Sequence, residues 1–145
     1  MDHIEILLVE DNLNDAELTI RALRKNNLAN NLVHVQDGAE ALDFVFCKGD
    51  YQDRNSLSKP KLILLDLKMP KIDGLEVLKV LKSDNETKHI PVVILTSSKE
   101  EKDLLESYKL GANSYIQKPV EFQKFMTAIV DIGFYWVILN QNLQK

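Results

Sequence analysis

Short apolar runs alternate along this chain with segments in which apolar residues recur at helical spacing. A short, nearly continuous apolar run is typical of a strand covered on both faces, and apolar residues three or four positions apart are typical of one face of a helix. Five strand-then-helix units are therefore predicted. The expected strands are residues 4–9, 31–35, 62–65, 90–95 and 113–116. The first expected helix begins at a cap on Asn14 or Asp15 and has Leu18, Ala22 and Leu23 on its apolar face. The others span 38–48 and 75–82, run from a capping box at Ser98 to Gly111, and span 121 to about 139.

This alternation predicts an α/β fold, because neighbouring parallel strands need crossover connections and helices supply them. We expect a doubly wound, five-stranded parallel sheet with helices on both faces. A length of 145 residues is typical of one domain, so residues 1–145 are predicted to form a single one. The polar segment at about 49–61 has no periodicity and is predicted to be a surface loop.

Charge and cysteine content narrow the class of protein. The chain has 22 acidic and 18 basic residues, a net charge of −4, which argues against binding to nucleic acid or to an anionic membrane. Its single cysteine, Cys47, excludes an internal disulfide and is expected to be a small buried apolar residue on a helix face. The start lacks a signal-peptide pattern, and the longest apolar run, 132–139, is far shorter than the about 20 residues that span a bilayer. A cytoplasmic location is expected.

Polar residues that could bind a ligand or take part in a reaction follow the predicted strands. Ligands of open parallel sheets bind at the carboxyl ends of the strands. Three carboxylates, a hydroxyl and an ammonium are expected to meet at this edge: Glu10, Asp11, Asp66, Thr96 and Lys118. Carboxylates this close repel one another unless a cation neutralises them, and oxygen ligands of this kind suit Mg²⁺. One carboxylate could then attack a phosphoryl group, with charge on that group stabilised by the cation, Lys118 and Thr96.

Four motifs in this order resemble the receiver domain of bacterial two-component response regulators. They are Glu10-Asp11, Asp66 followed by 69–74 (MPKIDG), Thr96-Ser97, and Lys118-Pro119 preceded by 111–115 (GANSY). The resemblance extends from residue 4 to the last helix. It implies the flavodoxin-like receiver fold with strand order 2-1-3-4-5, and it leaves no room within 145 residues for an output domain.

The resemblance also implies roles for the acidic residues. Asp66 would accept a phosphoryl group from the phosphohistidine of a sensor histidine kinase. Glu10, Asp11, Asp66 and the backbone carbonyl of Lys68 would ligate Mg²⁺. Many receivers have aspartate where this chain has Glu10, so the departure concerns the metal geometry.

The resemblance implies that the remaining motif residues bind the phosphoryl group or change conformation after phosphorylation. Thr96 would hydrogen-bond a phosphoryl oxygen, and Lys118 would pair with it. Tyr115 stands at the position of the aromatic switch residue, which moves inward as Thr96 shifts. The Lys118–Pro119 bond is commonly cis in such domains.

Other functions remain open at this point. A metal-dependent aspartyl-phosphate phosphatase would need a second aspartate two residues after Asp66, and Lys68 stands there instead. A phosphorylation-independent interaction domain would have no chemical need for the full set of site residues. The favoured interpretation is a stand-alone signalling switch, with self-phosphorylation and self-dephosphorylation as its only catalysis.

Partners follow from a narrower likeness and from the last helix. The loop at 49–61, the segment 64–71 and the aromatic closing helix are similar to small regulators that partner bacteriophytochrome-type histidine kinases. The closing helix has more apolar residues than one buried stripe needs, which favours a homodimer over a tail folded back on its own domain. Candidate dimer residues are Val130, Phe134, Val137 and Ile138. The downstream protein is not identified by the sequence.

Overall fold

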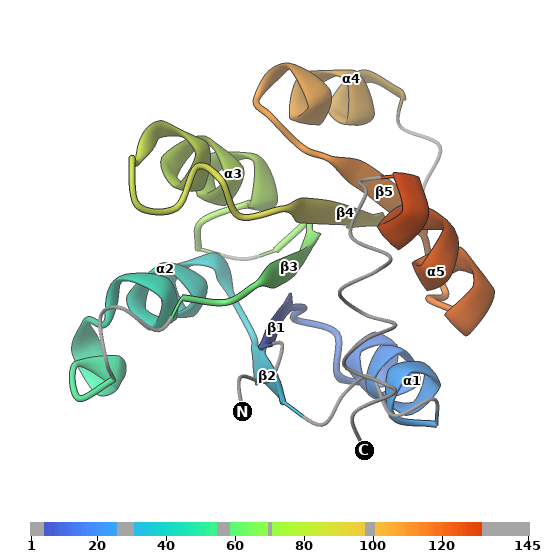
Figure 1. Cartoon of the computed structure of the whole chain (residues 1–145), viewed down its shortest axis with the longest axis horizontal. Coiled ribbons are helices and arrows are strands. Elements are labelled where there is room, and N and C mark those ends of the chain that lie inside the picture. Colours follow the sequence, from blue (N-terminus) through green and yellow to red (C-terminus); the bar gives the residue numbers. More distant parts are fainter. Residues whose placement is uncertain (1–4, 26–30, 55–58, 70, 98–100, 132–145) are drawn as a thin grey trace.

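One parallel sheet organises the molecule (Figure 1). The computed structural model describes residues 5–25, 31–54, 59–69, 71–97 and 101–131. Five strands lie side by side in the order β2-β1-β3-β4-β5, which confirms the predicted fold class and strand order. Their bounds are β1 (Ile6–Val9), β2 (Leu32–Val35), β3 (Leu62–Asp66), β4 (Val92–Thr96) and β5 (Ser114–Gln117).

Helices cover both faces of the sheet, as Figure 1 shows. They are α1 (Leu13–Arg24), α2 (Gly38–Phe46), α3 (Gly74–Ser83), α4 (Glu101–Lys109) and α5 (Phe122–Asp131), with a short 3₁₀ turn, η1 (Gly49–Tyr51), after α2. The core between the sheet and α1 and α5 contains Leu64 of β3, and the core on the other face contains Ile63 and Leu65. Because successive strand side chains point to opposite faces, a strand covered on both sides must be apolar at every position.

The start of α1 differs from the prediction, and of its expected apolar face Leu23 is buried but Leu18 is not. The N-cap is Asn12 rather than Asn14 or Asp15, and the Asn12 Oδ1 accepts a hydrogen bond from the Asp15 backbone N–H at 3.0 Å. Ala16 is buried, whereas Leu18, expected on the apolar face, is 47% exposed. The two positions are about 200° apart around the helix, so both cannot face the sheet.

Cys47 is not the buried helix residue that its apolar neighbours indicated. The helix α2 ends at Phe46, and Cys47 adopts the left-handed conformation with φ of 56° as the residue that follows. Its side chain is partly exposed. A left-handed residue stops the helix and redirects the chain, which the apolar pattern alone does not record.

The helix α4 exposes two large apolar side chains and buries a serine. Leu105 and Tyr108 are 63% and 43% exposed, whereas Ser107 is fully buried and its hydroxyl donates to the Leu104 carbonyl at 2.7 Å. The hydrogen bond within the helix allows the small serine to be buried against the domain. The predicted cap at Ser98 lies outside the described residues.

The segment predicted as a surface loop, 49–61, is tied to α2 by its first residues. The Tyr51 hydroxyl donates to the Glu40 carboxylate at 2.6 Å, and the Tyr51 ring meets the Phe44 ring edge to face. The Arg54 guanidinium lies 3.6 Å from the centre of the Phe44 ring. These contacts fix the beginning of the loop on the side of the sheet that carries α2.

Gly74 sets the distance between α3 and the end of β3. Its backbone N–H donates to the Leu67 carbonyl at 2.8 Å, and a Cβ at this position would lie 2.4 Å from the Asp66 carbonyl oxygen and 2.5 Å from the Leu67 Cα. Both neighbours are backbone atoms, which cannot move without moving the strand end. Glycine here therefore allows α3 to begin directly beside Asp66.

We expect Gly74→Ala to lower the free energy of unfolding by about 1–3 kcal/mol, the range for overpacking a closely packed position. Urea denaturation checks this value. Lys79→Ala, at an exposed position of the same helix, is the control and should change stability by less than about 0.5 kcal/mol. Equal stability of Gly74→Ala and the wild type would contradict the close approach.

Candidate functional site

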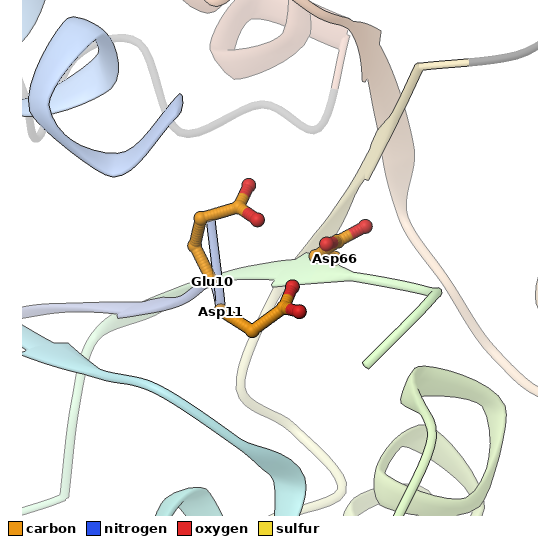
Figure 2. A group of neighbouring side chains, drawn as sticks. All are labelled: Glu10, Asp11 and Asp66. Atoms are coloured by element: carbon orange, nitrogen blue, oxygen red, sulfur yellow. The ribbon is translucent and has the colours of Figure 1, made fainter. Parts of the chain in front are cut away.

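Three carboxylates gather at the carboxyl ends of β1 and β3 (Figure 2). Glu10 and Asp11 follow β1 directly, and Asp66 is the last residue of β3. One oxygen of each side chain lies within 4.8 Å of one oxygen of each of the others. Glu10 is fully buried and Asp66 is 6% exposed, whereas Asp11 is exposed. The carboxylate cluster, Glu10, Asp11 and Asp66, is thus open to solvent on the Asp11 side.

Backbone groups hold the Glu10 residue in place. Its N–H donates to the Val35 carbonyl at 3.1 Å, which continues the pairing of β1 with β2. Its carboxylate accepts the Asn12 N–H at 3.2 Å, and its carbonyl oxygen lies 2.8 Å from the His34 Nε2. The buried carboxylate is therefore fixed by the same turn that leads into α1.

The buried ammonium of Lys118 neutralises part of the cluster. Its Nζ lies 2.6 Å from the Glu10 Oε1, 3.3 Å from the Asp66 Oδ2 and 3.2 Å from the Asp15 Oδ2, and its side chain is 11% exposed. The Lys118 backbone N–H donates to the Thr96 carbonyl at 2.7 Å, so the ends of β4 and β5 position it together. The peptide bond to Pro119 is cis.

Burial and neighbouring charges change the pKa values of both Glu10 and Lys118. The pKa of Glu10 is raised from 4.5 to about 7; desolvation by burial is the largest cause, the contact with Lys118 opposes it, and the nearby Asp66 adds to it. For Lys118, burial alone would lower the pKa, but the carboxylates of Glu10 and Asp66 outweigh it and raise the pKa above its ordinary value. Near neutral pH the cluster thus readily holds a proton at Glu10.

Thr96 and Tyr115 lie at different depths. Thr96 ends β4 and is 8% exposed, one residue after Leu95, which is the partner of Asp66 in the sheet register. Tyr115 lies on the edge strand β5 and is 47% exposed. The hydroxyl-bearing Thr96 is thus placed at the same sheet edge as the carboxylates, whereas the Tyr115 ring faces outward. Their switching roles remain predictions.

The cluster borders a surface cavity of about 480 Å³. Asp11 is one of its lining residues, so a small molecule or ion in the cavity lies next to the carboxylate cluster. The backbone N–H of Lys68, which also belongs to this rim, donates to the Asp66 Oδ1 at 3.3 Å. The lining residues are Asp11, Leu67, Lys68, Met69, Asp73, Leu75 and Asp103.

Asp15 is a site residue that the sequence analysis assigned only to helix capping. It stands in the first turn of α1, and its carboxylate contacts the Lys118 Nζ across 103 positions of sequence. No spacing along the chain indicates this contact, because it joins the first turn of α1 to a residue that follows β5.

The donor set fits a divalent cation. Three carboxylates within reach of one point supply hard oxygen ligands, and the exposed Asp11 leaves access for an ion with its own water. A cation there would also relieve the repulsion that raises the pKa of Glu10. The chemistry of the site is therefore that of a cation-assisted carboxylate centre.

The model of the response regulator receiver domain matches residues 6–130. The chain belongs to this family. It is thus a receiver domain of two-component signalling, as the motifs at the strand ends predicted.

Relatives of known structure have the same fold. The bacteriophytochrome response regulator AtBRR is 52% identical, with a TM-score of 0.86, and the match covers 94% of this chain and 96% of that one. The phosphorylated cyanobacterial phytochrome response regulator RcpA is 40% identical, with a TM-score of 0.75 and 95% of both chains covered.

A third relative is the response regulator Rcp1 of Synechocystis. It is 37% identical over 132 residues, which are 91% of this receiver domain and 88% of Rcp1. A structure of Rcp1 in its Mn²⁺-bound form has a TM-score of 0.74, is 36% identical, and the match covers 92% of this receiver domain and 94% of that chain.

Among the described residues, the helices are all too short or too polar to span a membrane.

The raised pKa of Glu10 predicts a pH dependence of stability in the absence of divalent cations. The folded state favours the protonated carboxyl, so this contribution to stability is complete below about pH 4.5 and is lost as the pH rises through about 7. Glu10→Gln removes the titrating group. Its unfolding free energy, measured by urea titration in chelator, should fall less between these pH values than that of the wild type. Parallel pH profiles of the two proteins would contradict the assignment.

Proposed function

We propose that this receiver domain accepts a phosphoryl group on Asp66 from the phosphohistidine of a sensor histidine kinase. The observation that carries the proposal is the position of Asp66, which is buried, shares an oxygen cluster with Glu10 and Asp11, and contacts the Lys118 ammonium. A carboxylate that can be offered both a divalent cation and an ammonium is suited to receive a phosphoryl group.

The proposed step is an in-line displacement at phosphorus. A carboxylate oxygen of Asp66 forms the new P–O bond while the P–N bond to the kinase imidazole breaks, and the imidazole leaves with the electron pair. Lys68 and Lys118 orient the nucleophile, since the Lys68 N–H contacts the Oδ1 and the Lys118 Nζ lies near the Oδ2. The Lys118 ammonium and the Thr96 hydroxyl stabilise charge on the transferred group. Later attack by water on phosphorus breaks the P–O bond to Asp66, which regains its carboxylate, and releases inorganic phosphate. Self-phosphorylation from small donors and self-dephosphorylation are the expected catalysis.

We assign the cation as Mg²⁺, held by Glu10, Asp11, Asp66 and the backbone carbonyl of Lys68. All four offer hard oxygen atoms, and carboxylates with retained water suit Mg²⁺. The Mn²⁺-bound form of Rcp1 supports a divalent cation in a relative. When bound, the cation supplies neutralisation of negative charge on the phosphoryl oxygens.

Thr96 and Tyr115 are the proposed switch residues. Thr96 already lies at the sheet edge, and Tyr115 is exposed on β5 with room to change its orientation. Movement of Thr96 toward the phosphoryl group would let the Tyr115 ring turn inward, which changes the surface offered to a downstream protein.

The cognate kinase is proposed to be of the phytochrome type. AtBRR and RcpA, at 52% and 40% identity, are both described as phytochrome-associated regulators. Identity of this extent over nearly the whole of both chains favours a similar docking surface in this receiver. We also propose that residues 1–145 act as a single receiver in the cytoplasm, with protein contact as the output.

A homodimer is the proposed assembly. Exposed apolar side chains occur on each of α4, β5 and α5, and Val130 is 54% exposed on the last described turn. Phe134, Val137 and Ile138, which were predicted to continue this surface, lie outside the described residues. An apolar surface shared by neighbouring elements is typical of a protein interface.

Phosphorylation is tested with a small phosphodonor and Mg²⁺. The wild type should gain the mass of one phosphoryl group in intact-protein mass spectrometry, and Asp66→Asn should gain none because its amide is a poor nucleophile. Glu17→Gln is the control, since Glu17 is exposed and pairs with Arg21. It should be labelled as the wild type is. Equal labelling of Asp66→Asn would refute the phosphoacceptor assignment, and undiminished labelling in chelator would refute the cation requirement.

Dimerisation is tested by the mass of the full chain in solution. Light scattering should give twice the chain mass, and Val130→Glu should shift the equilibrium toward the monomer, because the charge would be desolvated in the interface. Lys79→Glu, which introduces a glutamate at an exposed position of α3, should leave the mass in solution unchanged. A wild-type monomer with and without beryllofluoride would exclude the dimer and would leave the phosphoryl-transfer proposal intact.

A further inference from the structure

The Lys118 ammonium has as many carboxylate neighbours as it has hydrogen-bond donors. A lysine ammonium offers three N–H groups. Its Nζ lies 2.6 Å from Glu10, 3.2 Å from Asp15 and 3.3 Å from Asp66. The contact with Asp15 is a hydrogen bond. An ammonium that moves toward a phosphoryl oxygen on Asp66 therefore has to weaken its hydrogen bond with Asp15.

The three carboxylates differ in the free energy that each would lose if its contact with the Lys118 ammonium were broken. Glu10 is fully buried, and a buried carboxylate left without its cationic partner carries a large desolvation penalty. Asp66 is the residue that bears the phosphoryl group. The Asp15 side chain is 36% exposed, so water can replace the ammonium there at small cost. Asp15 is thus the partner that can exchange.

Asp15 is also held firmly enough to act as a competitor. Its backbone N–H donates a hydrogen bond to the Asn12 Oδ1 at 3.0 Å, and its carbonyl oxygen accepts one from the Thr19 hydroxyl at 3.0 Å. It therefore stands on the first turn of a regular helix rather than on a loop. Its carboxylate is not among the cluster that could hold a cation, so its contact with Lys118 is separable from cation binding.

We propose that Asp15 is a positioning residue that holds the Lys118 ammonium toward α1 in the unphosphorylated receiver and competes with the phosphoryl group for it. This inference rests on the proposed phosphorylation of Asp66. The contact stabilises the unphosphorylated state, because the Asp15 carboxylate holds the ammonium by a hydrogen bond and attracts it away from the phosphoryl oxygens. Loss of the Asp15 charge should accordingly favour the phosphoryl-bound state.

The test is binding of beryllofluoride, a phosphoryl mimic, to the full chain in the presence of saturating Mg²⁺. Asp15→Asn should bind it about two- to fivefold more tightly than the wild type, the range expected for loss of a partly exposed ion pair. Asp15→Glu keeps the charge and should remain close to the wild type. A second readout is the nitrogen NMR signal of the Lys118 Nζ in the ligand-free protein, which should shift in Asp15→Asn and be restored in Asp15→Glu.

Glu17→Gln is the matched control, because Glu17 has the same charge on the same helix and pairs with Arg21 at 2.7 Å instead. It should leave both readouts unchanged. Unchanged or weaker binding by Asp15→Asn would overturn the inference, and a purely structural role in α1 predicts that result. Equal tightening in Glu17→Gln would also overturn it, in favour of a general charge effect. If the wild type fails to bind beryllofluoride at all, the proposed function fails and the inference with it. If only Asp66→Asn fails to bind, the function stands.

Discussion

Repulsion among three carboxylates at one edge of a sheet is the constraint on which this site depends. Glu10 and Asp66 are buried, and their charges are tolerated because the Lys118 ammonium lies between them and a cation can approach from the Asp11 side. The balance is incomplete without a cation, as the raised pKa of Glu10 indicates. The site is therefore prepared for added positive charge and for the phosphoryl group that such charge would stabilise.

The parallel sheet delivers these groups to one place. Strand ends that are far apart in sequence become neighbours because β1, β3 and β4 are adjacent and point the same way. Backbone contacts refine the placement: Gly74 lets α3 begin against the end of β3, and the Thr96 carbonyl fixes the backbone of Lys118. Stability of the fold and geometry of the site are thus coupled through the same strand ends.

The site also reaches the first helix. Asn12 caps α1 and contacts the Glu10 carboxylate, while Asp15, one turn later, contacts Lys118. A change in the position of the Lys118 ammonium would therefore be felt at the start of α1 as well as at β4 and β5. This connection gives the proposed phosphorylation a route to two separate surfaces of the domain, one at α1 and one at the β5 edge.

The sequence by itself determined the succession of strands and helices along the chain, the α/β class and the members of the carboxylate cluster. Apolar periodicity and the residues that follow each strand are local properties of the sequence. Tertiary structure decided which helix faces are buried, and so reversed the expectation for Leu18. It also decided that Cys47 turns the chain out of α2 and that Asp15 contacts Lys118. Side-chain contacts across 103 positions depend on how helices pack on the sheet, and no spacing along the chain encodes that distance.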